Sequence, residues 1–326
     1  MRTNNVPSIA LFLSALCYSW FAWGESSTDN TPQQVQGGTL IQVAVLQQRA
    51  KQGDALAQWM LGNAYLEGIG VSQDYVAAAR WYAAASAQNL AKAQMVLGYL
   101  YEHGNGVRKD YREALRYYRA AAEQGDSMAE NNLALMYEDG RGTSKNPLEA
   151  LHWYLAAAQA GNPFAQCNLA SIYFLGPGLQ PDHQESARWF RAAAEQGIVQ
   201  AQHDLAVMYY HGDGVTKDYR EAAKWARHGA EAGYPPAQED FAYLLEQGQG
   251  VPLDYIAAYT WYSAAAARGL HKSANRMKSL EEVMLPEQIR LAKSRSLAWA
   301  AEHGHPEQVP GEYDSRSFSL FPEKER

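Results

Sequence analysis

Apolar and polar positions along this chain repeat every 36 residues. In the unit formed by residues 90–125, the apolar residues Ala93, Leu97, Leu100 and Tyr101 recur at the spacing of one face of an α-helix. A Gly-x-Gly pair follows this helix and a single glycine closes the unit. Glycine can take the left-handed backbone conformation that ends a helix. The pattern therefore predicts two helices in each unit, folded back on each other as a hairpin.

The glycines keep this spacing over most of the chain. The closing glycine recurs as Gly125, Gly161, Gly197, Gly233 and Gly269, and the Gly-x-Gly pair as Gly68/Gly70, Gly104/Gly106, Gly140/Gly142, Gly176/Gly178, Gly212/Gly214 and Gly248/Gly250. They define six repeats, 54–89, 90–125, 126–161, 162–197, 198–233 and 234–269. A hairpin of this size cannot bury its apolar face alone, so we expect the repeats to stack and to share one continuous core.

Polar and aromatic positions within the repeat predict helix starts and packing. Side chains that can cap free backbone amides stand at the start of first helices, at Asp54, Asp126 and Asn162, and of second helices, at Asp74, Asp110, Asp182, Asp218 and Asp254. The second helix combines a run of alanines with an aromatic column, Trp81, Tyr117, Trp153, Trp189, Trp225 and Trp261. Because alanines let helices approach closely, we expect these rings, Trp153 among them, to be buried between hairpins.

The segments that flank the repeats predict caps. Residues 39–53 match the second half of a repeat and indicate an N-terminal cap helix. Residues 270–303 have helical patterning without a Gly-x-Gly turn, so we expect C-terminal capping helices, the last of which begins at Pro286. Residues 304–326 are interpreted as a flexible tail.

The first residues indicate export. Residues 1–24 have the positive start, apolar run and small final residues of a secretory signal peptide. We therefore expect cleavage, a periplasmic or secreted protein and no stable membrane insertion after cleavage. The alternative is an inner-membrane anchor formed by residues 6–23. Residues 25–38 are polar and are interpreted as a flexible linker.

Composition and charge narrow the classes of partner. Of the 326 residues, 47% are hydrophobic and 12% are aromatic, which is enough for a packed interior. The net charge is −7 and no basic run is longer than a pair, so neither nucleic acid nor an anionic membrane surface is expected as a partner. Two cysteines are too few for a disulfide framework. We interpret Cys167 as a packed side chain, with a reactive thiol as the alternative.

Motifs that carry enzyme chemistry are missing from the sequence. The Gly-x-Gly pairs do not lead into Gly-Lys-Ser/Thr, so we interpret them as helix ends and not as phosphate loops. The nine histidines lack metal-ligand spacing and are interpreted as surface or groove residues. No nucleophile motif is present. We therefore expect no catalytic residues, no metal and no cofactor.

The repeat resembles a known family, the Sel1-like repeats, which are relatives of the tetratricopeptide repeats. In the second repeat the residues that carry the resemblance are Ala93, Leu97-Gly98, Tyr101, Gly104-x-Gly106-Val107, Asp110-Tyr111, Ala114, Tyr117-Tyr118, Ala121-Ala122 and Gly125. The resemblance covers about residues 39–269 and implies an all-α fold, a right-handed α-solenoid of stacked helical hairpins with terminal capping helices. It also implies a non-enzymatic, monomeric adaptor or scaffold for other proteins, as in exported bacterial members.

One secreted branch of that family suggests an alternative function. Its members tie each hairpin with a cysteine pair, and some are described as binding or hydrolysing β-lactams. This chain lacks those cysteine pairs. A hydrolase or binder that acts on β-lactam or cell-wall-type ligands is therefore kept as the alternative to the scaffold.

Positions that vary between repeats and face one side are available for recognition. If first helices line the inner face, as the resemblance implies, four columns qualify. They are Leu56, Lys92, Met128, Phe164, Gln200 and Pro236; Trp59, Met95, Asn131, Cys167, His203 and Glu239; Asn63, Tyr99, Leu135, Ser171, Val207 and Tyr243; and Leu66, Glu102, Glu138, Phe174, Tyr210 and Glu246. For some of these residues the alternative to recognition is packing against the adjacent hairpin. For the third column the two interpretations have equal weight.

Rings, thioethers and amides dominate these columns, as they do in protein-binding surfaces. We predict that a protein or peptide partner binds through Trp59, Met95, Tyr99, Asn131, Phe164, Phe174 and Tyr210. Lys109 and Lys217 are interpreted as residues of the outer turns that take no part in binding.

Overall fold

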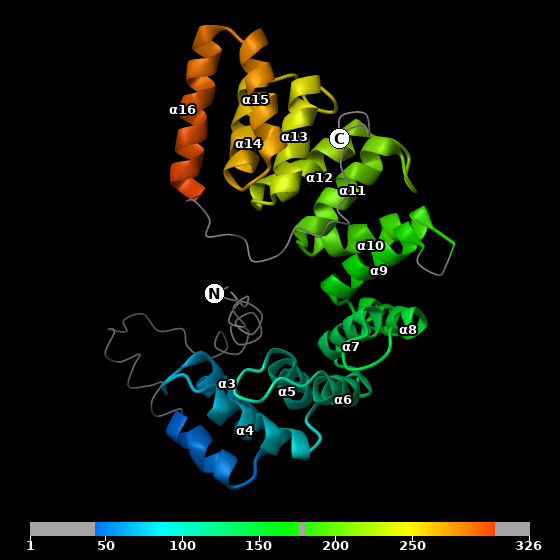
Figure 1. Cartoon of the computed structure of the whole chain (residues 1–326), viewed down its shortest axis with the longest axis vertical. Helices are drawn as coiled ribbons and strands as arrows, with labels where there is room; N and C mark the ends of the chain where they lie inside the picture. Colours follow the sequence, from blue (N-terminus) through cyan, green and yellow to red (C-terminus); the bar gives the residue numbers. More distant parts are fainter. Residues whose placement is uncertain (1–42, 177–179, 304–326) are drawn as a thin grey trace, which may run out of the picture. The chain divides into compact units, whose positions relative to one another are not determined.

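The computed structural model describes residues 43–176 and 180–303, and these residues form α-helices joined by turns (Figure 1). The chain divides into two compact units, Met1–Asn162 and Pro163–Arg326. The division falls between the third and fourth repeats, although the 36-residue period continues through it without a break. The predicted signal peptide, linker and C-terminal tail lie outside the described residues.

Each repeat forms one helical hairpin. The first unit contains a helix at 43–51 followed by α3 (Ala55–Glu67), α4 (Tyr75–Ala87), α5 (Ala91–His103), α6 (Tyr111–Ala122), α7 (Ser127–Asp139) and α8 (Pro147–Gln159). The second unit contains α9 (Pro163–Leu175), α10 (His183–Glu195), α11 (Val199–His211), α12 (Tyr219–Glu231), α13 (Pro235–Gln247), α14 (Tyr255–Ala267), α15 (His271–Val283) and α16 (Pro286–His303). The predicted all-α solenoid fold of stacked hairpins is confirmed.

Within residues 43–176 and 180–303, no helix is both long and apolar enough to cross a lipid bilayer.

Side-chain caps fix where many of the helices begin. Asp54 Oδ1 accepts a hydrogen bond from the amide of Ala57 at 3.0 Å. Asp126 Oδ1 accepts one from the amide of Ala129 at the same distance, 3.0 Å. The predicted caps of the second helices are confirmed at Asp74, Asp110, Asp182, Asp218 and Asp254. Asn146 caps α8 in the same way, a role that the sequence analysis did not assign.

The two glycines of a Gly-x-Gly turn have different tasks. The first ends the helix: Gly104 has a φ of 79°, and its amide donates to the carbonyl oxygen of Leu100 at 2.8 Å. The second lets hairpins meet, because a Cβ on Gly106 would lie 2.0 Å from the carbonyl oxygen of Tyr75 at the start of α4. Helix closure, the interpretation made from sequence, therefore accounts for the first glycine only.

The rings at the centre of the hairpins do not come from the predicted aromatic column. They come from the next residue, and the fully buried members are Tyr82, Tyr118, Tyr154, Phe190 and Tyr262. Trp153 is half-buried, as are Trp81, Tyr117 and Trp261, whereas Trp189 and Trp225 are buried. Consecutive helix residues point about 100° apart, so only one of two neighbouring rings can point straight at the hairpin centre. The prediction of a buried ring is wrong for Trp153, whereas Trp189 and Trp225 of the same column are buried as predicted.

Glutamine side chains tie successive hairpins together. Gln58 of α3 donates from Nε2 to the carbonyl oxygen of Ala50 at 3.1 Å, at the end of the preceding helix. The equivalent bonds run from Gln202 to Ala194 and from Gln238 to Ala230, both at 3.2 Å. Each of these carbonyl oxygens also accepts from the amide of the closing glycine, so the glutamine adds a second hydrogen bond at the end of the helix.

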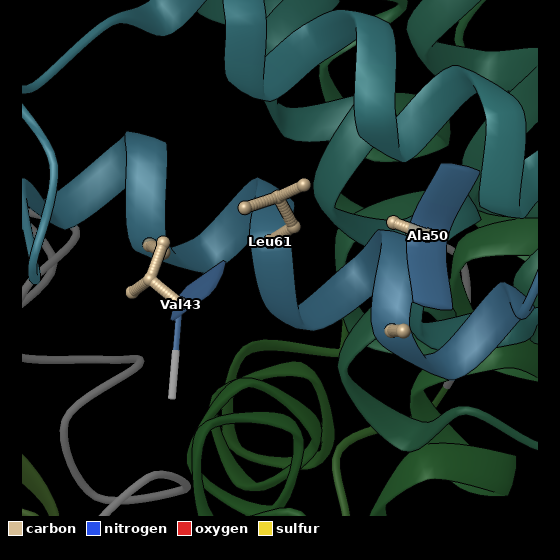
Figure 2. Packing of buried hydrophobic residues seen from close by; sticks show 5 residues of the cluster. Val43, Ala50 and Leu61 are labelled. Atoms are coloured by element: carbon tan, nitrogen blue, oxygen red, sulfur yellow. The ribbon is translucent and has the colours of Figure 1, made fainter. Parts of the chain in front are cut away.

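Extra helices flank the hairpins at both ends of the described chain. The helix at 43–51 places Val43 and Ala50 in an apolar cluster with Leu61 of α3 (Figure 2). At the other end, α16 packs against α14, where the ring centres of Trp299 and Trp261 are 5.8 Å apart. The residues of α16 are otherwise largely exposed, and its buried residue is Ala292.

Candidate partner-binding surface

The seven predicted binding residues are divided between the two units. Trp59 of α3, Met95 and Tyr99 of α5 and Asn131 of α7 belong to the first unit. Phe164 and Phe174 of α9 and Tyr210 of α11 belong to the second. Each unit therefore has its own candidate surface on its first helices, and a binding role for the seven residues stays a prediction.

Burial separates the predicted residues into two groups. Phe164 is 39% exposed, and Trp59, Tyr99, Phe174 and Tyr210 are half-buried, so these five have surface to offer a partner. Met95 and Asn131 are buried, as are Cys167, His203 and Glu239 of the same column. The second column therefore packs inside the stack for most of its length. The burial of Cys167 agrees with its interpretation as a packed side chain.

In five of the six repeats, variation in the fourth column follows the ring on the second helix of the same repeat. In the first repeat the column holds Leu66, and the buried Tyr82 donates to Asn63 instead. The buried Tyr118 donates a hydrogen bond to Glu102 at 2.7 Å. Tyr154 donates to Glu138 and Tyr262 to Glu246, also at 2.7 Å. Where the second helix lacks a tyrosine, as at Phe190 and Ala226, the column changes to Phe174 and Tyr210. In the second, third and sixth repeats the glutamate in this column is therefore the acceptor for a buried hydroxyl, and its presence has a packing cause.

At the turn end of the hairpin in the second repeat, polar and charged side chains pair with one another. Glu102 accepts from Tyr118 and also forms an ion pair with Arg141, the middle residue of the next Gly-x-Gly turn. Arg141 also forms a second ion pair, in which its Nε lies 3.1 Å from Asp139 Oδ2. Because hydrogen bonds and opposite charges already satisfy this carboxylate, it has little to offer a partner.

The turn end of the hairpin in the fifth repeat carries an aromatic cluster with one lysine. We call it the Lys217 cluster, and it consists of Tyr210 of α11, Lys217 of the turn, Tyr219 of α12 and Tyr243 of α13. The ring centre of Tyr210 is 5.2 Å from that of Tyr219 and 6.3 Å from that of Tyr243. Lys217 Nζ lies 5.6 Å from the Tyr210 ring centre and 4.8 Å from that of Tyr219. Three tyrosines and a cation thus meet at the turn end of first helices.

The electrostatics of Tyr210 reflect this crowding. Burial raises the pKa of its phenol well above the ordinary value, and the hydrogen bond and charge of Tyr243 act in the same direction. The phenol therefore keeps its proton at neutral pH and can donate it in a hydrogen bond.

Lys217, Tyr219 and Tyr243 were not among the predicted binding residues. Lys217, interpreted as a residue of the outer turns that takes no part in binding, lies over the ring of Tyr210, which is predicted to bind. Its role in binding stays a prediction. One signal for the cluster was present in the sequence: a tyrosine in the third column follows another 24 residues earlier, both at Tyr219/Tyr243 and at Tyr75/Tyr99. The loop residue between them could be placed only once the turn had a structure.

The first unit carries a shallow depression near the second of these tyrosine pairs. It measures about 720 Å³, and its lining includes Tyr65, Val71, Tyr75 and Val76 with the backbone of Gly106. Tyr75 is 39% exposed. The ring of Tyr99 stacks on His103, with 4.0 Å between ring centres. The exposed rings of this unit thus gather at the turn end of the hairpins, as in the fifth repeat.

A buried charged cluster supports the second unit from inside. His203 Nδ1 lies 3.0 Å from Asp204 Oδ1, and its Nε2 lies 3.0 Å from Asp240 Oδ2, with each side chain at most 2% exposed. Burial alone lowers the pKa of His203, but the hydrogen bonds and charges of the two aspartates outweigh it and raise that pKa to about 10. His203 is therefore a charged link between α11 and α13, and its interpretation as a surface or groove residue is wrong.

Known proteins similar to this chain share its repeat. The family model for the Sel1 repeat matches residues 55–90, 91–126, 127–162, 163–198, 199–234 and 235–270, one residue later than the repeats defined above. The crystal structure of c5321, described as a protective antigen present in uropathogenic Escherichia coli strains displaying an SLR fold, is 33% identical over 81% of this chain, with a TM-score of 0.75. The chain spans 56% of the length of that protein.

A second solved structure is matched over almost its whole length. A Sel1 repeat protein from Oxalobacter formigenes is 32% identical, with a TM-score of 0.63 over 73% of this chain and 96% of that one. The search of curated proteins gave no match.

Proposed function

Because the chain belongs to the Sel1 repeat family, we propose that it is an exported, non-enzymatic scaffold that holds a protein or peptide partner on its first helices. Sel1 repeat proteins are generally protein-interaction modules, and this general role applies here. The finer proposal adds a location for the protein and a surface for the partner.

The observation that carries the proposed surface is the Lys217 cluster. Its three rings are packed against one another and stay half-exposed. Rigid aromatic side chains bury a large apolar area on binding and lose little conformational entropy, which is why they are frequent at the centre of protein interfaces. Tyr99 and Trp59 offer comparable half-buried rings on the first unit.

Export is supported by the composition of residues 1–24. The similar protein c5321 is described as a protective antigen. For this chain we expect a mature protein that begins near Glu25 and fractionates outside the cytoplasm. Amino-terminal sequencing of the purified protein tests this, and a soluble cytosolic protein that retains Met1 would overturn it.

The alternative function has no specific support. The branch that acts on β-lactams is recognised by a cysteine pair in each hairpin, and the sequence has two cysteines in total. Exposure of the purified protein to a chromogenic β-lactam should therefore give no hydrolysis above the buffer rate.

The proposed surface is tested with the double variant Tyr99→Ala, Tyr210→Ala. It should weaken binding of the partner, once that partner has been captured from envelope extract and purified, by at least tenfold, or about 1.4 kcal/mol. The melting temperature should change little. The matched control is Arg112→Glu with Arg220→Glu, two exposed positions in the first turn of second helices. Loss of binding in the control and not in the tyrosine variant would move the partner to the outer face.

A further inference from the structure

We propose that the Lys217 cluster binds an acidic segment of the partner, with Lys217 contacting a carboxylate side chain and the tyrosine rings covering its apolar neighbours. This inference rests on the proposed function, because it assigns a chemistry to the partner that the scaffold would hold. It follows from the geometry of the cluster and from a comparison with the equivalent turn in the second repeat.

The geometry fixes the position of the cation. Lys217 Nζ lies above two rings at once, 5.6 Å from the centre of Tyr210 and 4.8 Å from that of Tyr219. The side chain of Lys217 is exposed, and none of the ion pairs within residues 43–176 and 180–303 includes it. The ammonium group is thus held in place by the rings, and its charge is available to a ligand.

The second repeat shows what the same turn looks like when its charges are already matched. Lys109 is the equivalent of Lys217, and it lies 4.7 Å from the ring centre of Tyr111, the equivalent of Tyr219. The equivalent of Tyr210 is Glu102, which is paired with Arg141. A carboxylate therefore belongs to the protein in the second repeat, whereas in the fifth repeat a neutral phenol takes its place.

The combination is particular to one repeat. Along the six repeats, the residue at the Lys217 position is Gln73, Lys109, Lys145, Pro181, Lys217 and Leu253. Of the three lysines at this position, Lys217 alone belongs to a repeat with a tyrosine both in the fourth column, Tyr210, and at the start of the second helix, Tyr219. The second helix of this repeat carries Ala226 where others carry a buried ring, and the phenol of Tyr210 is instead hydrogen-bonded to Tyr243 and Gln249.

The chemistry of the cluster favours an anionic group with apolar neighbours. A carboxylate can accept from the ammonium group of Lys217, while the rings cover adjacent apolar side chains. The nearby Glu246 accepts from Tyr262 at 2.7 Å and lies 3.8 Å from Arg276, so its charge is directed to these groups. The net charge of −7 opposes acidic partners at long range, but charges beyond about 10 Å are largely screened at 0.1 M salt.

The test uses the full chain and three synthetic peptides that alternate leucine with glutamate, glutamine or lysine. Binding is followed by fluorescence anisotropy of the labelled peptides. The glutamate peptide should bind at least about tenfold more tightly than the glutamine peptide, and added salt should reduce this difference. Lys217→Met, which keeps the apolar stem, should abolish the preference. The matched variant Lys109→Met should leave it intact.

Three results would overturn the inference: equal binding of the glutamate and glutamine peptides, an unchanged preference in Lys217→Met, or no binding of any peptide. The proposed function fails separately. A partner whose binding depends on Tyr99 and Tyr210 but is insensitive to salt and to Lys217→Met supports the scaffold and refutes the acidic segment. Tighter binding of the lysine peptide than of the other two would indicate a basic partner and would also refute the acidic segment.

Discussion

In the second repeat the turn end of α5 is closed, because Glu102 accepts from the buried Tyr118 and pairs with Arg141. In the fifth repeat the same three positions hold Tyr210, Ala226 and Gln249. Every member of the paired network has thus been replaced, and the place of the carboxylate is taken by a half-exposed ring next to Lys217.

The backbone does not explain this difference. Both helices end at a left-handed glycine, with φ 79° at Gly104 and 84° at Gly212, and each amide donates to a carbonyl oxygen at 2.8 Å. Two kinds of variation therefore occur at one place in the fold. A change that is matched by its packing neighbour maintains the stack. A change that leaves side chains exposed creates the surface that we propose for recognition.

The largest effect should come from removing the ring that closes the second repeat. Tyr118→Ala should lower the free energy of unfolding by about 3 to 5 kcal/mol, since it empties a fully buried site and takes a hydrogen bond from Glu102. Tyr210→Ala should cost only about 1 kcal/mol, because that ring is half-exposed. Urea unfolding of both variants measures the contrast. Equal losses would show that the two ends do not differ in the way described.

The next largest effect is the pH dependence of the free energy of unfolding, which we expect from the buried His203 of the second unit. Where the second repeat has Met95 and Val96, the fifth has His203 and Asp204. The pKa of His203 is raised from 6.5 to about 10 in the folded protein, so its stabilising contribution is fully present below pH 6.5. This contribution is lost as the pH rises through 10, at up to about 1.4 kcal/mol per pH unit.

Urea unfolding at a series of pH values from 6 to 11 checks this pH dependence. The matched variant is His203→Asn, which carries the residue that the third repeat has at this position, Asn131. The wild type should lose stability across the window and the variant should lose much less. Parallel curves for the two proteins would mean that His203 is not the group responsible.

A smaller effect is expected from the charge of Glu102. Glu102→Gln keeps an acceptor for Tyr118 but removes the ion pair with Arg141, which is partly exposed, so the loss should be about 1 kcal/mol. Tyr210→Phe at the equivalent position should be close to neutral for stability. A double-mutant cycle with Arg141→Met isolates the pair, and a coupling energy of zero would remove the ion pair from the closed network.

The sequence predicts the repeat, the hairpins and most of the caps because these depend on local patterns. The helix periodicity, the aspartates at second-helix starts and the left-handed glycines each act within a few residues. The identity of the buried ring is harder to predict. Trp153 and Tyr154 are neighbours, both aromatic, and a rotation of about 100° decides which of them faces the core.

The candidate surface was predictable only in part, for a related reason. The variable columns identified Tyr210, but variation alone does not separate Glu102 from Tyr210. The pairing of positions 16 residues apart, Glu102 with Tyr118 and Tyr210 with Ala226, contains that information and can be read from the sequence. The position of Lys217 over two rings depends on the path of the turn, which the sequence pattern does not specify.

The most direct test of the account asks which of the two repeat ends touches the partner. A photoreactive phenylalanine analogue is placed in vivo at Tyr219 or at the equivalent Tyr111, both half-buried and both first residues of a second helix. We expect a crosslinked adduct from position 219 that is lost when Tyr210→Ala is added, and little or none from position 111. An adduct from position 111 of equal or greater yield, or none from position 219, would contradict a partner surface at the Lys217 cluster.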